Sequence, residues 1–337
     1  MKATIAGIDR ALPERRVTNA DLASEHPDWD MEKIAERAGV LERRVCASDE
    51  TALDLGQRAS EALLERLAVP RSDVGALIVC TQSPDHIMPP NACLLQHRLE
   101  LPTSIPAFDF TLACSGYVYG LFLAKSLITS GASDSILLVT ADSYSRYLHP
   151  DDRSTVTLFG DGGAATLVRG AEAGSAGIGD FCLGTDGGSA DIFAIQAGGA
   201  RLPRSPETAV STVDPGGSTS SPEHIAMDGA RVLAFVRKRV PAVVDELLTK
   251  TNESLDDIDL VIFHQGSAMT LDYVERWLSL PPEKTFRNIA TVGNTVSASI
   301  PIALRDAELA GRLESGMRVL LVGFGVGLSW GACRVNW

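Results

Sequence analysis

The chain has 337 residues, of which 45% are apolar and 22% are charged, a composition typical of a well-packed globular protein. Its 30 basic and 43 acidic residues give a formal net charge of −13, which argues against nucleic-acid binding because contacts to phosphate depend on Lys and Arg. The sequence has no apolar run long enough for a membrane span, and its first residues lack the pattern of a signal peptide. We therefore expect a cytoplasmic protein that binds neither nucleic acid nor membranes.

Helices and strands are predicted to alternate along the chain. A helix is predicted over residues 51–68. Short apolar runs rich in β-branched residues predict buried strands at 76–79, 136–140, 164–168, 260–263 and 319–322. Strands that are apolar throughout are typical of sheets covered by helices on both faces. The pattern predicts a layered α/β fold.

The two halves of the chain are loosely alike. A Gly-rich turn between two late strands occurs at residues 159–163 and again at 323–327, which is the pattern of an internal duplication. Residues 198–221 are rich in Gly, Pro, Ser and Thr without an apolar period, and they predict a long loop. We therefore divide the chain into a first half, residues 1–170, and a second half, residues 171–337.

One cysteine stands out by its surroundings. The six cysteines show no spacing typical of zinc sites or disulfide frameworks, and we expect all of them to be reduced: Cys46, Cys80, Cys93, Cys114, Cys182 and Cys333. Cys114 alone lies between an apolar strand and an apolar helix, within Ala-Cys-Ser-Gly. The macrodipole at a helix N-terminus stabilises a thiolate, and the small neighbours leave room for a substrate. A packed core cysteine is the alternative interpretation, which we keep for the other five.

Two further polar residues also lie at the ends of predicted elements. His264 follows the apolar run Leu-Val-Ile-Phe, and Asn294 precedes a helix of small residues in Gly-Asn-Thr-Val-Ser-Ala-Ser. Taken singly, His264 is as well explained as a buried structural histidine. Asn294 alone could be an N-cap or turn residue. Their order after Cys114, each at an element terminus, is the more specific signal.

Cys, His and Asn in this order resemble the condensing enzymes of the thiolase superfamily, and most of all β-ketoacyl-acyl-carrier-protein synthase III. The resemblance covers nearly the whole chain. Its motifs are Glu-Arg-Arg (42–44), Ala-Cys-Ser-Gly around Cys114, Asp-Asp-Arg-Ser-Thr (151–155), Phe-Gly-Asp-Gly (159–162), His-Gln (264–265), Gly-Asn-Thr (293–295) and Gly-Phe-Gly-Val-Gly-Leu-Ser-Trp-Gly (323–331). It implies a thiolase-like fold whose two pseudo-duplicated halves form α-β-α-β-α layers, and a homodimer whose interface runs near residues 80–125.

The resemblance implies a role for each of the three residues. Cys114 takes an acyl group from a thioester, and a malonyl thioester on acyl carrier protein then enters. His264 and Asn294 stabilise the enolate formed as carbon dioxide leaves, and this carbanion attacks the acyl-cysteine. The backbone N–H groups of Cys114 and Val326 form the oxyanion hole. No metal or other cofactor is implied, because decarboxylation itself drives the condensation.

The acyl pocket implied by the family includes Tyr144, Phe159 and Ile225. Met88 stands where the family has an aromatic side chain that reaches across the dimer interface into the partner's pocket. Ordinary core or interface packing is the alternative explanation of Met88.

Binding of coenzyme A or phosphopantetheine is implied at basic residues, namely Arg37, Arg153 and Arg276. Three positions depart from the family pattern. Lys33 replaces a Trp that stacks on adenine, Ala230 replaces an Asn of the pantetheine channel, and Met269 replaces a basic residue after the catalytic His. These departures predict weaker use of coenzyme A primers, and they are typical of a divergent branch in specialised acyl metabolism.

Other functions remain open on the same residues. One alternative keeps the fold and Cys114 but transfers the acyl group to an alcohol or amine. Asn294 favours condensation, because plain acyl transfer has no enolate to stabilise. A second alternative is a non-catalytic partner subunit, against which the intact Cys, His and Asn set argues. Chalcone-synthase-like enzymes share the three residues, but the short chain and the 151–155 motif favour synthase III.

Overall fold

The protein is built on two mixed β-sheets, as a computed structural model that describes residues 2–172, 177–214 and 217–337 shows. The first sheet has the strand order β1-β7-β6-β4-β5. Its strands are β1 (Lys2–Ala11), β4 (Ala76–Cys80), β5 (Ala107–Phe110), β6 (Ser135–Asp142) and β7 (Gly162–Ala171). Strand β4 runs parallel to β5 and β6, whereas β7 is antiparallel to both β6 and β1.

The second sheet repeats this arrangement with the order β13-β14-β15-β8. Its strands are β8 (Ile178–Thr185), β13 (Leu260–Phe263), β14 (Arg318–Gly325) and β15 (Ser329–Asn336). Strand β13 is parallel to β14, and β15 is antiparallel to both β14 and β8. A single parallel bridge between Val261 and Thr285 lies where β5 pairs with β4 in the first sheet. The matching order confirms two pseudo-duplicated halves; the boundary near residue 170 stays a prediction.

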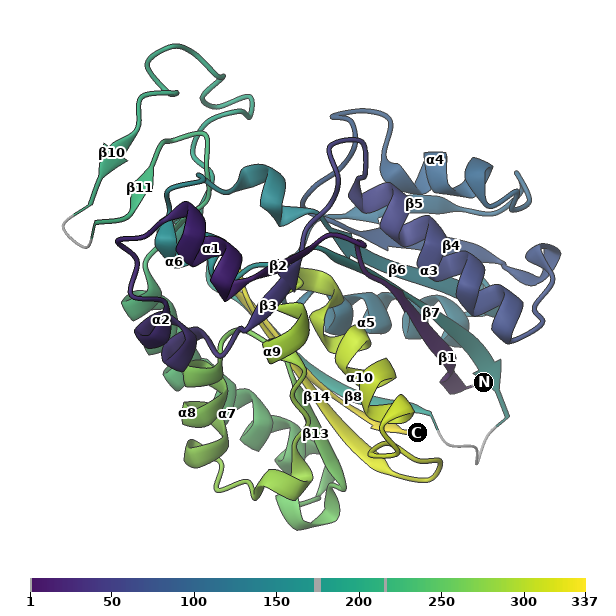
Figure 1. Cartoon of the computed structure of the whole chain (residues 1–337). Coiled ribbons are helices and arrows are strands. Elements are labelled where there is room, and N and C mark those ends of the chain that lie inside the picture. The colour runs from purple at the N-terminus through teal and green to yellow at the C-terminus, as the bar shows by residue number, and fades with distance from the viewer. Residues whose placement is uncertain (1, 173–176, 215–216) are drawn as a thin grey trace.

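Helices form the other three layers, as Figure 1 shows. Outside the first sheet lie α3 (Ala52–Arg66) and α4 (Asn91–Arg98), between the sheets lie α5 (Gly116–Thr129) and α10 (Ser299–Leu309), and outside the second sheet lie α7 (Gly229–Thr251) and α8 (Ala268–Trp277). The α-β-α-β-α arrangement is therefore confirmed. Each middle helix contacts both sheets, since α5 packs on β6 and β14 while α10 packs on β7 and β13.

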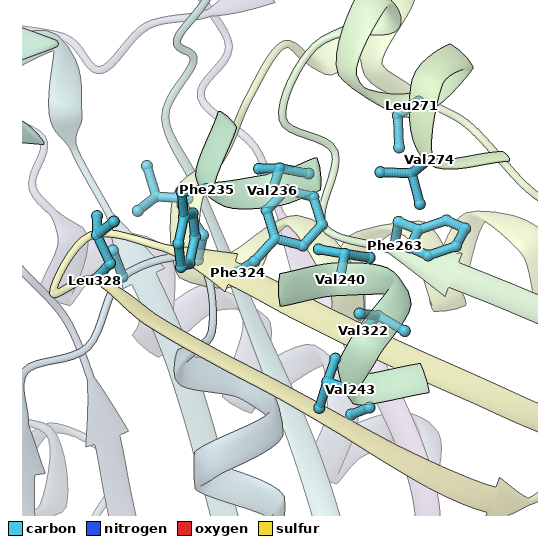
Figure 2. Packing of buried hydrophobic residues seen from close by; sticks show 14 of the residues in the cluster. Phe235, Val236, Val240, Val243, Phe263, Leu271, Val274, Val322, Phe324 and Leu328 are labelled. Atoms are coloured by element: carbon cyan, nitrogen blue, oxygen red, sulfur yellow. The ribbon is translucent and has the colours of Figure 1, made fainter. Parts of the chain in front are cut away.

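Burial explains the composition of the middle and outer helices. Helix α5 is apolar on nearly every side because sheets cover two of its faces. Gly120 allows its close approach, since a Cβ there would lie 2.7 Å from Leu138 Cδ1. Helix α7 is amphipathic, and Figure 2 shows Val236 and Val240 on its inner face against Phe263 of β13 and the residues of β14.

The remaining elements are short strands and helices outside the two sheets and the six helices that cover them. They are β2 (Arg16–Thr18), α1 (Asn19–Glu25), α2 (Met31–Ala38), β3 (Glu42–Arg44), α6 (Arg153–Val156), β9 (Phe193–Ala194), β10 (Thr212–Val213), β11 (Thr219–Ser220), β12 (Ala226–Met227) and α9 (Ile289–Val292). In the described part of the predicted loop over 198–221, the regular elements are the short strands β10 and β11, which project from the body in Figure 1. Among the described residues, no helix has the length and apolarity that a membrane crossing requires.

Candidate active site

The three residues singled out in the sequence line one pocket of about 390 Å³. Cys114 lies between β5 and α5, His264 follows β13 directly, and Asn294 lies between α9 and the 3₁₀ turn Val296–Ala298. All three side chains are buried. Since the residues come from both halves of the chain, the pocket exists only because the two sheets pack around α5 and α10.

Cys114 is enclosed by the Gly-rich loop that follows β14. A Cβ at Gly325 would lie 2.9 Å from the Cys114 Sγ, so only glycine allows this approach. Ser329 donates a hydrogen bond to the Val326 carbonyl at 2.9 Å, and its Oγ lies 2.7 Å from Ser115 Oγ. Because the single Ser329 hydroxyl proton is used on Val326, Ser115 is the donor in the serine pair. This chain of bonds ties the loop to the residue next to Cys114.

The thiol of Cys114 is not held as a thiolate in the unliganded site. Burial raises its pKa, the nearby charge of Asp142 raises the pKa further, and the Cys114 backbone N–H lowers it. Our expectation that the helix N-terminus would stabilise a thiolate is therefore outweighed by desolvation. At neutral pH Cys114 enters the reaction as a thiol.

His264 is a neutral imidazole. Burial lowers its pKa to about 3, since the charged form is disfavoured away from water. Its Nδ1 lies 2.6 Å from Ser299 Oγ on α10, and its ring is nearly perpendicular to the Phe324 ring, with the two ring centres 5.5 Å apart. When Ser299 donates this bond, the ring proton resides on Nε2, which is then a hydrogen-bond donor.

The side-chain amide of Asn294 is fixed at both ends. Its Oδ1 accepts the Val296 N–H at 3.0 Å, and its Nδ2 donates to the Gly266 carbonyl at 3.3 Å. The Asn294 backbone N–H is bonded to the Leu158 carbonyl at 2.9 Å. An amide NH₂ has two hydrogens, so one remains to donate toward a ligand in the pocket.

The basic residues predicted for the nucleotide are partly brought to this pocket. Arg37 on α2 and Arg153 on α6 line it. Arg276 lies outside the lining, with its guanidinium 5.6 Å from the centre of the Tyr273 ring. Its role in binding coenzyme A or phosphopantetheine stays a prediction, without support from this position.

The positions that depart from the family pattern lie at or near the entrance. Met269 lines the pocket. Lys33 is exposed, and its ammonium group pairs with Asp30 at 2.6 Å. Ala230 is exposed on the first turn of α7. The guanidinium-bearing residues Arg37 and Arg153 line the pocket, whereas Lys33 lies outside its lining and pairs with Asp30.

Of the predicted acyl-pocket residues, only Phe159 lines the pocket. Tyr144 lies behind it, with the two ring centres 5.3 Å apart, and its hydroxyl donates to Gln82. Ile225 is buried in the same apolar cluster. Met88 lies on the surface with 78% of its area exposed.

Sequence reasoning missed most of the apolar lining, because it comes from three separate parts of the chain and apolar side chains look alike whether they face a pocket or the core. They are Phe193, Val232, Leu233, Phe235, Val236, Phe324 and Leu328. Figure 2 shows Phe235, Phe324 and Leu328 close together beside α7. An apolar pocket that contains a few polar groups suits a ligand with a hydrocarbon part and a carbonyl.

Family models and relatives agree with this geometry. Residues 108–187 match the family described as 3-oxoacyl-[acyl-carrier-protein (ACP)] synthase III, and residues 248–337 match its C-terminal part. The chain is 36% identical over 331 residues to a beta-ketoacyl-[acyl-carrier-protein] synthase III of Chlamydia caviae, with 98% of this chain and 96% of the relative covered. The chain belongs to the synthase III family. This confirms the resemblance found in the sequence.

Solved synthase III structures have the same fold over the full length. One 3-oxoacyl-(acyl-carrier-protein) synthase III is 45% identical, with a TM-score of 0.97 and complete coverage of both chains. The enzyme from Thermus thermophilus is 35% identical, with a TM-score of 0.86 and 99% of each chain covered. The thiolase-like fold predicted from the sequence is therefore confirmed.

Proposed function

We propose that this synthase III family member loads an acyl group on Cys114 and condenses it with a malonyl thioester, with loss of carbon dioxide. The observation that carries the proposal is the meeting of a thiol, a neutral imidazole and an amide donor in one buried pocket. A neutral His264 and the spare Asn294 hydrogen are the donors that an enolate oxygen requires. We propose no metal or organic cofactor.

Loading is an exchange of one thioester for another. Cys114 Sγ attacks the acyl carbonyl, the carbon–sulfur bond to the carrier breaks, and the Cys114 proton passes to the departing thiolate. The tetrahedral intermediate carries a negative oxygen, for which the N–H groups of Cys114 and Val326 are the proposed donors. The bonds among Ser115, Ser329 and Val326 support this role by fixing the loop.

Condensation uses the other wall of the pocket. As the malonyl carboxylate leaves as carbon dioxide, its bonding electrons form an enolate whose oxygen accepts hydrogen bonds from His264 Nε2 and Asn294 Nδ2. The enolate carbon attacks the acyl-cysteine carbonyl. The Cys114 sulfur leaves and recovers a proton from solvent, and a 3-ketoacyl thioester is released. Low polarity around the pocket strengthens both hydrogen bonds.

The carrier end of each thioester would lie at the entrance, where Arg37 and Arg153 line the pocket. Guanidinium groups suit the phosphate of phosphopantetheine. Lys33 and Ala230 offer neither a stacking face nor an amide, which favours acyl carrier protein over coenzyme A as carrier. We propose acyl carrier protein as the protein partner.

We also propose a homodimer with an interface near residues 80–125. Ile87 and Met88 are adjacent and expose 94% and 78% of their area, and exposed apolar groups of this size are typical of interfaces. Light scattering at micromolar concentration should give twice the chain mass. A monomer mass under these conditions would contradict the dimer.

The direct test is intact-mass spectrometry after incubation with a panel of acyl thioesters, followed by addition of malonyl-acyl-carrier-protein. We expect one acyl mass on the wild type, none on Cys114→Ala, and a 3-ketoacyl product after the malonyl donor is added. Acylated enzyme that releases its acyl group only to an alcohol or amine would replace condensation by plain acyl transfer. An acyl mass on Cys114→Ala would overturn the assigned nucleophile.

A further inference from the structure

A buried carboxylate links the two halves behind the pocket. Asp142 ends β6 and is fully buried. Its Oδ1 accepts the Gln82 N–H at 2.7 Å, and its Oδ2 accepts both the hydroxyl and, at 3.2 Å, the backbone N–H of Ser297. Burial raises the pKa of Asp142 and these hydrogen bonds lower it in part, with a net value raised to about 6, so the carboxylate form is favoured at neutral pH.

Ser297 belongs to the segment that carries the enolate donors. It lies three residues after Asn294 and two residues before Ser299, the partner of His264. Asp142 of the first half thus bonds to the segment 294–299 of the second half. This segment contains Asn294 and also Ser299, which bonds to His264. Each oxygen of Asp142 serves a different half, because Gln82 follows β4 and Ser297 precedes α10.

The residue between Asn294 and Ser297 that most needs this support is Val296. Its φ is +53°, and its side chain is fully buried. A left-handed conformation is unfavourable for any L-residue and especially for a β-branched one. Such a conformation persists only where neighbouring contacts hold it. The Val296 N–H is also the donor that fixes Asn294 Oδ1, so the backbone at Val296 sets the direction of the Asn294 amide.

We propose that Asp142 and Ser297 are positioning residues for decarboxylation: they hold Val296 in the left-handed conformation that aims the Asn294 amide at the enolate oxygen. The proposal rests on the proposed function, since it needs an enolate in this pocket. It assigns the two residues no contact with substrate. Loading at Cys114 does not use Asn294, so this half-reaction is expected to be unaffected by the hydrogen bond from Ser297.

The first variant is Ser297→Ala, with acyl loading followed by intact mass and decarboxylation followed by labelled carbon dioxide. We expect loading near the wild-type rate and release of carbon dioxide lowered about tenfold, the factor that corresponds to the left-handed penalty of one L-residue. Asp142→Asn is the second variant, because an amide whose oxygen accepts the Gln82 N–H presents an NH₂ group to Ser297 and cannot accept the Ser297 backbone N–H. It should also slow release of carbon dioxide, while loading should not fall, because removal of the Asp142 charge lowers the pKa of the Cys114 thiol.

The decisive comparison adds a second change at Val296. Glycine adopts positive φ without penalty, whereas alanine does not. In the Ser297→Ala background, Val296→Gly should therefore restore most of the lost carbon dioxide release, and Val296→Ala should not. Both changes remove the buried isopropyl group, so the pair differs mainly in backbone freedom. Ser60→Ala, which removes a buried hydroxyl bonded to Gly56 at 2.7 Å on α3, is the control for loss of a buried hydrogen bond elsewhere. It should leave both half-reactions unchanged.

Four outcomes overturn the inference. Ser297→Ala could decarboxylate at the wild-type rate while Asn294→Ala is slow, which would leave the proposed function intact and remove the positioning role. Equal losses in loading and decarboxylation would mean a general structural role. Equal behaviour of the glycine and alanine double variants would remove Val296 from the argument. If Asn294→Ala itself releases carbon dioxide at the wild-type rate, the proposed function fails and this inference fails with it.

Discussion

The two walls of the pocket are built differently. On the Cys114 wall the proposed donors are backbone N–H groups, and the close approach of Gly325 leaves little freedom around the sulfur. On the opposite wall the donors are the side chains of His264 and Asn294, which depend on Ser299 and Val296 for their direction. Backbone donors are held in place by the fold itself, whereas side-chain donors need hydrogen bonds from neighbouring residues to fix their direction.

The two walls also differ in how the other half of the chain supports them. Ser329 in the second half holds the loop beside Cys114 through neutral hydroxyl bonds. Asp142 in the first half holds the turn after Asn294 through a buried charge. A buried charge that loses a partner costs more than a neutral group does. Loss of a partner of Asp142 is therefore expected to destabilise the fold more than loss of the Ser115–Ser329 pair.

The largest effect on the main-chain wall is expected for Ser329→Ala. This variant frees the Val326 carbonyl and thereby loosens the loop that carries the Val326 N–H. Loss of one oxyanion donor typically costs about 10²–10³ in rate, and partial displacement should slow loading by about 10–100-fold. Stopped incubations with an acyl thioester, followed by intact mass, measure this rate.

Ser135→Ala is the matched control, because Ser135 is a buried serine whose Oγ has no hydrogen-bond partner within the described part of the chain. It should load at the wild-type rate. If Ser329→Ala also loads at that rate, the loop is held without the serine pair and the contrast between the walls disappears.

The sequence predicted the positions of the reacting residues but not their supports. Cys114, His264 and Asn294 each end or begin an element, so the strand and helix pattern placed them at one edge of the sheets. Ser299 lies 35 residues from His264, and Ser115 lies 214 residues from Ser329. Nothing local marks such pairs, because a buried serine has the same sequence context whether or not it faces a catalytic group.

The buried strands were predictable because each one leaves a local pattern in the sequence, whereas contacts between the two halves of the chain leave none. The apolar runs at 76–79 and 260–263 coincide closely with β4 and β13, since burial on both faces leaves a clear pattern. The macrodipole expected to stabilise a thiolate at Cys114 is outweighed by burial, which raises the pKa of this thiol. The helix N-terminus is visible in the sequence, whereas the burial that outweighs it depends on both sheets.

A smaller effect is expected from the carrier of the primer. Lys33 lacks a stacking face, and its ammonium is paired with Asp30. Loss of stacking on a base corresponds to about 1–3 kcal/mol, or about tenfold in affinity or more. Matched acyl groups should therefore give kcat/KM about tenfold higher on acyl carrier protein than on coenzyme A. Similar values for the two carriers would show that the entrance recognises coenzyme A by other contacts.

A further effect concerns the pH dependence of the free energy of unfolding. The pKa of His264 is about 3 in the folded protein and about 6.5 in an unfolded chain. Below pH 6.5 the unfolded state therefore binds a proton that the native state does not, and this contribution to stability is lost as pH falls toward 3. Wild type should lose about 1.4 kcal/mol per pH unit more than His264→Gln between pH 6 and 4.

Denaturant unfolding of both proteins across this range measures that difference. Asp142 has a folded pKa raised to about 6 and acts in the opposite direction, but it is present in both proteins and cancels. Parallel pH profiles for wild type and His264→Gln would mean that His264 titrates in the folded protein as it does in the unfolded chain, so that burial does not keep it neutral.

The central claim is that the side-chain wall serves decarboxylation and the main-chain wall serves loading. Asn294→Ala tests it most directly, with acyl loading measured by intact mass and carbon dioxide release measured from a labelled malonyl donor. We predict loading near the wild-type rate and decarboxylation lowered by about 10²–10³, because one of two enolate donors is removed. Release of carbon dioxide at the wild-type rate from Asn294→Ala would contradict the condensation mechanism and leave plain acyl transfer in its place.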